Sequence, residues 1–219
     1  MSEHDENKTV EPGSPKNDQM DAYVKEAKNV LSVAWAFLLK LFKSPMTAME
    51  EGLPLVPAIA FAAVQPILVF VLIRVLFAQF MGLFMPTFGF GGLFWSPGFG
   101  WWVMVFFLTI VAVAASYAVL IVLTMLFAKL FCKAKTNFVQ LFTQAVAAHV
   151  PLSLALIVAI IFGFFATSLA LTALIVAYIA SILLYHKALT VTIKADQNKI
   201  FFVLVCSFGA TALLSMFFV

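Results

Sequence analysis

Five long apolar stretches fill most of the chain after residue 54, and they limit what it can fold into. Each is about 18 to 28 residues long, and a helix of about 20 apolar residues crosses the hydrocarbon core of a bilayer. We therefore predict an all-α integral membrane protein with five transmembrane helices, preceded by an amphipathic interfacial helix. The predicted spans are residues 55–80, 101–128, 146–165, 167–184 and 200–219.

Residues 146–184 could be counted as one apolar segment, but 39 residues is far too long for a single crossing. Gly163 and the group Ala166-Thr167-Ser168 interrupt the segment near its middle. We expect a tight hairpin there, with one span on each side of it.

The composition excludes several classes of function. Hydrophobic residues make up 64% of the chain and charged residues 11%, and nine of the ten carboxylates lie at or before Glu51, leaving only Asp196 beyond it. Enzymes with paired carboxylates, proton relays through Asp or Glu and acidic calcium sites need side chains that the spans lack. Cys132 and Cys206 are too few for a zinc or disulfide framework. We predict no catalytic residue, metal site, cofactor or nucleic-acid partner.

The region before the spans divides into two parts. Residues 1–20 are polar and predict a disordered cytoplasmic tail. Residues 21–52 predict a basic amphipathic helix over 21–43 and a short helix, started by Ser44-Pro45 and closed by Gly52. The predicted bundle of five spans covers residues 53–219. The amphipathic helix either lies among the lipid headgroups or packs on the cytoplasmic ends of the spans. Its predicted membrane-surface contacts are Lys25, Lys28, Trp35, Lys40 and Lys43.

Lysine placement predicts the orientation of the bundle. Lysines precede span one and occupy the connections between spans two and three and between spans four and five. The other two connections, 81–100 and about 163–168, hold no charged residue. Because basic loops stay on the cytoplasmic side, we expect a cytoplasmic N-terminus and an outward C-terminus.

Arg74 is the only charged residue inside a span. It could snorkel toward the outer interface or make a structural hydrogen bond. It could instead hold an anion such as a lipid phosphate, in a pocket shared with the glycine- and phenylalanine-rich segment 81–100. That segment forms either an aromatic belt or a lipid-contacting lid. The candidate anion or headgroup site comprises Arg74, Trp95, Trp101 and Trp102.

Two proline positions predict kinks with a polar side chain beside them. Gln65 precedes Pro66 in the first span, and His149 lies two residues before Pro151 in the third. Pro151 frees backbone carbonyls one turn earlier, around Ala147, and a neutral His149 could satisfy one of them. A proton-relay role for His149 is the alternative. Small residues at fourfold spacing in spans three to five indicate close packing, within the bundle or between copies, with hydroxyls that can bond across the interface.

Three segments resemble the Yip family of five-span membrane proteins, which includes Rab-interacting members and short prokaryotic relatives. They are Phe42–Glu50 (FKSPMTAME), Thr136–Phe142 (TNFVQLF) and Ala147–Leu152 (AAHVPL). The resemblance covers about residues 36–219. The chain lacks the long cytoplasmic domain and the acidic Asp-Leu-Tyr-Gly-Pro motif of the trafficking members, so it is similar to the short bacterial branch. The resemblance implies a multi-pass protein of a bacterial plasma membrane.

Taken together, these features favour a non-enzymatic membrane scaffold that organises lipids or partners. Its expected partners are the lipid bilayer, anionic lipids, and other membrane proteins or further copies of itself. The competing interpretation is a transporter or lipid-translocating protein with an anion site at Arg74.

Overall fold

The computed structural model describes the backbone of residues 15–88, 98–163 and 165–216, and the side chains of 21–81, 98–163 and 165–214. Over these residues the chain is helical and contains no strand, which confirms the predicted all-α class. The helices are α1 (Pro15–Lys43), α2 (Pro45–Glu51), α3 (Leu55–Phe88), α4 (Phe99–Cys132), α5 (Phe138–Gly163), α6 (Thr167–Ile193) and α7 (Gln197–Met216).

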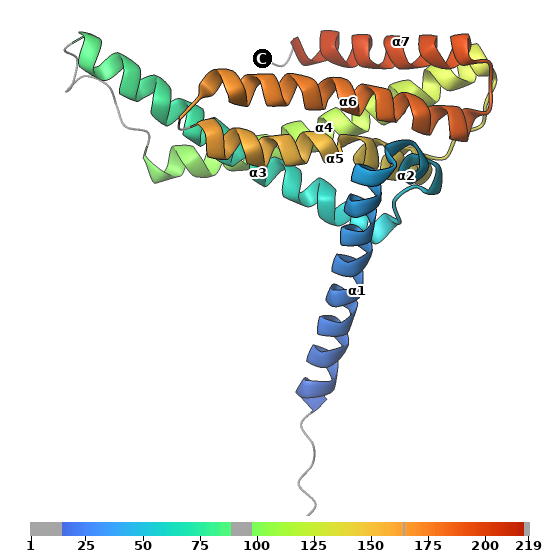
Figure 1. Cartoon of the computed structure of the whole chain (residues 1–219), viewed down its shortest axis with the longest axis horizontal. Helices are drawn as coiled ribbons and strands as arrows, with labels where there is room; N and C mark the ends of the chain where they lie inside the picture. The colour runs from blue at the N-terminus through green and yellow to red at the C-terminus, as the bar shows by residue number, and fades with distance from the viewer. Residues whose placement is uncertain (1–14, 89–97, 164, 217–219) are drawn as a thin grey trace, which may run out of the picture.

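Helices α3 to α7 are long and apolar enough to cross a membrane, so the chain is a multi-pass membrane protein. They lie alongside one another, with α5 between α3 and α6, and with α4 packed against α7 (Figure 1). α5 is the central helix, because 56% of its apolar window is buried against 22–28% in the other four. Many apolar side chains of the other four spans are exposed on the surface of the bundle.

The boundaries of α5 and α6 differ from those predicted. α5 begins at Phe138, eight residues before the predicted start, because the Asn137 side chain accepts a hydrogen bond from the Val139 amide (2.9 Å) and caps the helix. α6 continues to Ile193, nine residues past the predicted end. Its last turns bury Tyr185 and Leu189 completely. The helix therefore continues beyond the predicted span, and its Lys187 side chain pairs with Glu50.

The tight hairpin between α5 and α6 is confirmed. α5 ends at Gly163 and α6 begins at Thr167. The carbonyl oxygen of Phe162 accepts hydrogen bonds from the amides of Phe165 (2.9 Å) and Ala166 (2.7 Å), which closes the turn.

α2 follows the predicted start and stop signals. Ser44 occupies the N-cap position, Pro45 the first helical position, and Gly52 ends the helix with φ 74°, a backbone conformation that glycine adopts without strain. The Ser44 hydroxyl makes no capping hydrogen bond. Ala48 and Met49 are fully buried, so α2 is part of the core.

α1 runs crosswise to the spans and projects from the bundle (Figure 1). It begins at Pro15, six residues before the predicted helix, so residues 15–20 are helical; the first 14 residues of the predicted tail lie outside the described residues. Phe37 and Leu41 in its last turns are buried in the main core. The C-terminal part of α1 thus packs on the rest of the protein and the N-terminal part extends beyond it.

Candidate functional site

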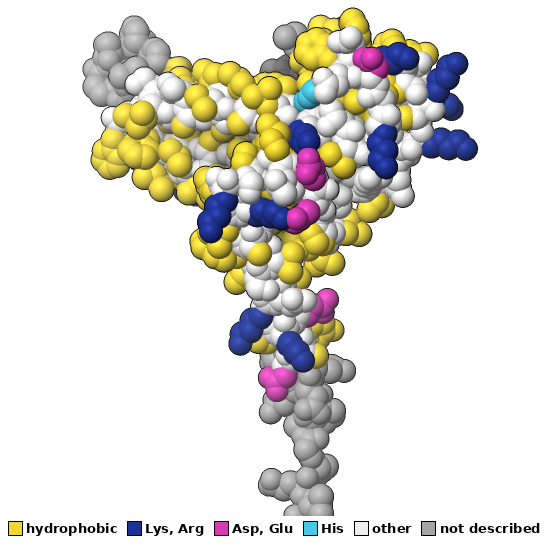
Figure 2. Space-filling model, turned by 45° about the vertical axis from the view of Figure 1, so that its right-hand side comes forward, with side chains coloured by type: hydrophobic (Ala, Val, Ile, Leu, Met, Phe, Trp, Pro, Cys, Tyr) yellow, Lys and Arg dark blue, Asp and Glu magenta, His cyan; other side chains and the backbone are white. Residues whose placement is uncertain are grey.

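Lysine side chains gather at one end of the bundle, the end where α4 leads to α5 and α6 to α7 (Figure 2). We call this the lysine-rich end. Helix α2 packs there against α5 and α6. The lysines of the two connections and of the adjoining helix turns are Lys129, Lys133, Lys135, Lys194 and Lys199.

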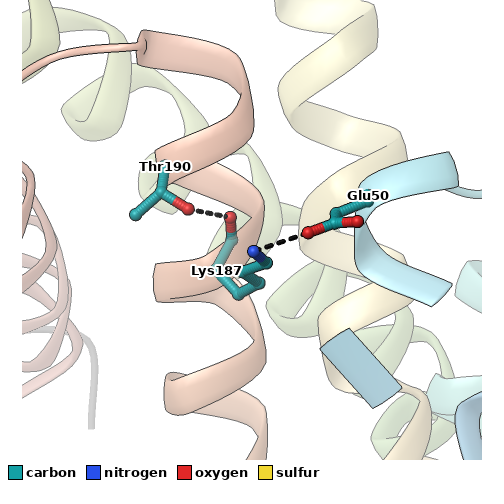
Figure 3. A network of polar contacts seen from close by, with 3 residues as sticks. All are labelled: Glu50, Lys187 and Thr190. Atoms are coloured by element: carbon teal, nitrogen blue, oxygen red, sulfur yellow. Dashed lines mark hydrogen bonds and ion pairs between the residues drawn. The ribbon is translucent and has the colours of Figure 1, made fainter. Parts of the chain in front are cut away.

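Two ion pairs from α2 fix α1 to the bundle. Oε1 of Glu50 lies 2.7 Å from Nζ of Lys187 on α6 (Figure 3). Glu51, the next residue, pairs with Lys40 in α1. The Lys187 carbonyl oxygen also accepts a hydrogen bond from the Thr190 hydroxyl (2.6 Å). Through adjacent carboxylates, α2 therefore connects the last turns of α1 to the lysine-rich end of α6.

The outer surface of α1 carries an apolar strip, which we call the α1 strip. Its residues are 46–75% exposed and lie within about 40° of one another around the helix, at 100° per residue. The members are Val24, Leu31, Trp35 and Phe42. Of the predicted surface contacts, Trp35 belongs to the strip, Lys25, Lys28 and Lys43 are exposed beside it, and Lys40 is half-buried in its ion pair.

Arg74 lies in the part of α3 far from the lysine-rich end, near the first turn of α4. Its Cζ atom is 5.5 Å from the ring centroid of Trp102, a cation–π geometry that contributes about 0.5–1 kcal/mol at an exposed site. Trp102 contacts Trp101 edge-to-face, with centroids 4.8 Å apart, and Phe77 at 5.5 Å. The structure therefore brings together three of the four predicted residues, while Trp95 lies outside the described residues.

A cluster of polar side chains lies inside the bundle. The Tyr117 hydroxyl on α4 donates a hydrogen bond to Oε1 of Gln65 on α3, and both residues are buried. The Tyr117 ring also meets the His149 ring of α5 edge-to-face, with centroids 5.4 Å apart. Gln65 is ten residues after Leu55, about 15 Å along the helix, so the cluster lies deep in the apolar part of the bundle.

The His149 side chain binds a backbone carbonyl of its own helix. Its Nδ1 atom lies 2.7 Å from the carbonyl oxygen of Ala145, one turn earlier in α5. This carbonyl lies two residues before Ala147, because a helical side chain leans toward the residue four positions before it. α5 continues through Pro151 to Gly163 without a break.

A hollow of about 340 Å³ opens beside this cluster, where α3 to α7 meet. Its polar lining comes from Gln65, Ser116, Tyr117, His149, Tyr178 and Thr211. A second hollow of about 490 Å³ lies between α3 and α4 and is lined by apolar side chains and Tyr117. Pro66 lines this second hollow, so the predicted Gln65-Pro66 pair contributes one residue to each.

Tyr117 was not singled out from the sequence, although it holds the polar cluster together. The available signal was a tyrosine in the middle of an apolar span, where its hydroxyl must find a partner inside the protein. Which partner it finds depends on the packing of α4 on α3.

The described residues contain no group of three or more His, Cys, Asp or Glu side chains that could hold a metal ion. Comparison with known proteins found no matching family model, no matching curated protein and no matching solved structure.

Proposed function

We propose that the protein is a non-enzymatic membrane scaffold of the Yip type in a bacterial plasma membrane. In this proposal α1 lies along the cytoplasmic surface and organises lipids or partner proteins there. The observation that carries it is the placement of α1, crosswise to five spans and with an exposed apolar strip (Figure 1).

The geometry supports a location at the membrane surface in three ways. If α3 to α7 cross the bilayer, a helix crosswise to them at one end runs roughly parallel to the membrane plane. That end is lysine-rich, which is typical of the cytoplasmic side. A basic helix with exposed Trp and Phe is typical of segments that lie among headgroups, and each basic residue near an anionic surface contributes about 1 kcal/mol.

The ion pairs of α2 suit a scaffold. A free amphipathic helix can rotate and tilt, whereas α1 is held at its C-terminal end by the Lys40–Glu51 pair and by buried Phe37 and Leu41. The α1 strip is then presented at a constant angle to the spans. Lipids or the apolar face of a partner would meet the same surface on every copy.

Crosslinking and affinity purification from native membranes tests the scaffold proposal. We expect the full chain to retain a reproducible set of partners that is lost when Leu31, Trp35 and Phe42 are all changed to Glu. The control carries three Glu at Asn29, Ser32 and Ala36, exposed residues of α1 outside the strip. Loss of partners in both variants, or no specific partner of the full chain, would contradict the proposal.

One observation favours a transporter or lipid-translocating protein as the alternative. Arg74 lies beside Trp102 and forms no ion pair with a described carboxylate, so its charge is available to an anion. In liposomes this alternative predicts faster movement of labelled anionic lipid than in empty vesicles, with the excess removed by Arg74→Ala. Equal rates in protein-containing and empty vesicles would exclude it.

A further inference from the structure

The hollow of about 340 Å³ beside the polar cluster, which we call the polar hollow, shares two lining side chains with the hollow of about 490 Å³ between α3 and α4, which we call the apolar groove. Val113 and Tyr117 line both of them. All groove-lining residues other than Tyr117 are apolar. A molecule with an apolar chain in the groove would therefore meet its one polar lining residue at Tyr117, next to the polar cluster.

Two side chains of the cluster offer unused hydrogen-bonding atoms to the hollow. The Ala145 carbonyl oxygen can only accept, so Nδ1 of His149 carries the hydrogen and Nε2 of the neutral ring is an acceptor. Oε1 of Gln65 accepts the hydrogen bond from Tyr117, which leaves the Gln65 amide nitrogen as a donor. The hollow thus presents one acceptor and one donor on neighbouring helices.

The hydroxyls of Ser116 and Thr211 add acceptors to the hollow. Ser116 donates its hydrogen to the Ala112 carbonyl oxygen (2.8 Å), and Thr211 donates to that of Ser207 (2.7 Å). Both hydroxyl oxygens keep lone pairs free while their hydrogens are used within their own helices. A ligand that suits this lining brings a hydrogen to donate and also accepts one, as a hydroxyl group does.

The lining also selects against a charged ligand. No Lys, Arg, Asp or Glu lines either hollow. An ion buried without a partner loses several kcal/mol of solvation, which hydrogen bonds from neutral groups do not recover here. Water alone could occupy the polar hollow, but it would gain nothing from the apolar groove beside it.

We propose that the two hollows together bind one uncharged lipid with a hydroxyl or glycerol head group, such as a diacylglycerol. One acyl chain lies between α3 and α4, and the molecule enters sideways from the bilayer past Tyr117. The head-group hydroxyl donates to Nε2 of His149 and accepts from the amide of Gln65. This site is independent of the scaffold role of α1.

Photolabelling of the full chain in phosphatidylcholine nanodiscs tests the proposal. The probe is a diacylglycerol with a photoreactive group in one chain. We expect labelled peptides from α3 and α4 around the groove. Excess dioleoylglycerol should reduce the labelling at least fivefold, whereas dioleoyl phosphatidic acid, with the same chains and a charged head, should leave it nearly unchanged. Equal competition by the two lipids would overturn the proposal.

A pair of adjacent substitutions provides the matched control. Ala114 lines the groove, and Ala115 is an exposed residue that does not. Ala114→Phe should abolish the competable labelling and Ala115→Phe should preserve it, with both proteins monodisperse and equally helical. His149→Leu should also weaken labelling, but the Ala114 and Ala115 pair decides the result even if this variant does not fold. Equal labelling of the two Phe variants, or labelling spread evenly over all spans, would show non-specific lipid contact only.

Discussion

The hydroxyl of Tyr117 donates a hydrogen bond to Oε1 of Gln65, a side chain 52 residues earlier in the chain. The bond joins α4 to α3 within the apolar part of the bundle. A hydrocarbon core offers no water to replace a lost partner, so buried polar groups are satisfied by other protein groups. The Tyr117–Gln65 pair therefore fixes how α4 packs beside α3 and also shapes the hollow between the five spans.

Removing this bond should destabilise the bundle modestly. Hydrogen bonds between transmembrane helices contribute about 0.6 kcal/mol on average in double-mutant cycles, with a maximum of about 1.7. We expect a coupling free energy in that range between Tyr117→Phe and Gln65→Leu, measured by unfolding in mixed micelles. A coupling of zero would show that the two side chains do not interact in the folded protein.

The ion pair that fixes α2 to α6 should contribute less. The Glu50 and Lys187 side chains are 50% and 31% exposed, and pairs exposed to solvent contribute about 0.2–1 kcal/mol. Glu50→Lys should lower the melting temperature in detergent, and adding Lys187→Glu should restore it. Glu26→Lys, at an exposed glutamate of α1, is the matched control. Failure of the charge swap to restore stability would contradict the pairing.

Gly163 should be intolerant of a large side chain. A Cβ atom placed there would lie 3.3 Å from Cγ1 of Val75, because α5 approaches α3 closely at this point. Gly163→Leu should separate the two helices and lower the melting temperature. Gly209→Leu is the control, since nothing lies within 4 Å of a Cβ atom at that position. An equal effect of both changes would argue against the close approach.

The orientation of the bundle can be tested by labelling single cysteines in a background without Cys132 and Cys206. Cysteines at the exposed positions Lys135 and Asn198 should resist an impermeant thiol reagent in intact cells, and one at Gly98 should react. Lys135 and Asn198 lie at the lysine-rich end, whereas Gly98 precedes the opposite end of α4. The reverse pattern would invert the proposed topology.

Much of the fold could be predicted from the sequence, because the length of an apolar stretch determines whether a helix can cross a bilayer. The start of α5 and the end of α6 could not be predicted. The first depends on capping by Asn137, and the second on the burial of Tyr185 against other helices. The sequence shows that the hydroxyls of Ser181 and Ser207 can bond across a helix interface, but not which partner they take. They donate to the carbonyl oxygens of Ala177 (2.8 Å) and Val203 (2.6 Å), four residues earlier.

The candidate sites were less predictable than the spans. Arg74, Trp101 and Trp102 could be named because charge and tryptophan are conspicuous in an apolar sequence. The role of Tyr117 and the direction of α1 depend on contacts between distant segments, such as the ion pair of Lys40 with Glu51. Periodicity along a single helix carries no information about such contacts.

The most direct test of the account is the depth of α1 in the membrane, measured with spin labels on the full chain in anionic liposomes. Labels at Leu31, Trp35 and Phe42 should be accessible to oxygen, which partitions into lipid, and protected from a water-soluble nickel chelate. Labels at Lys25, Asn29 and Ala36 should show the opposite accessibility. If all six labels are accessible to the nickel chelate, α1 projects into water and the scaffold proposal, with α1 at the membrane surface, is wrong.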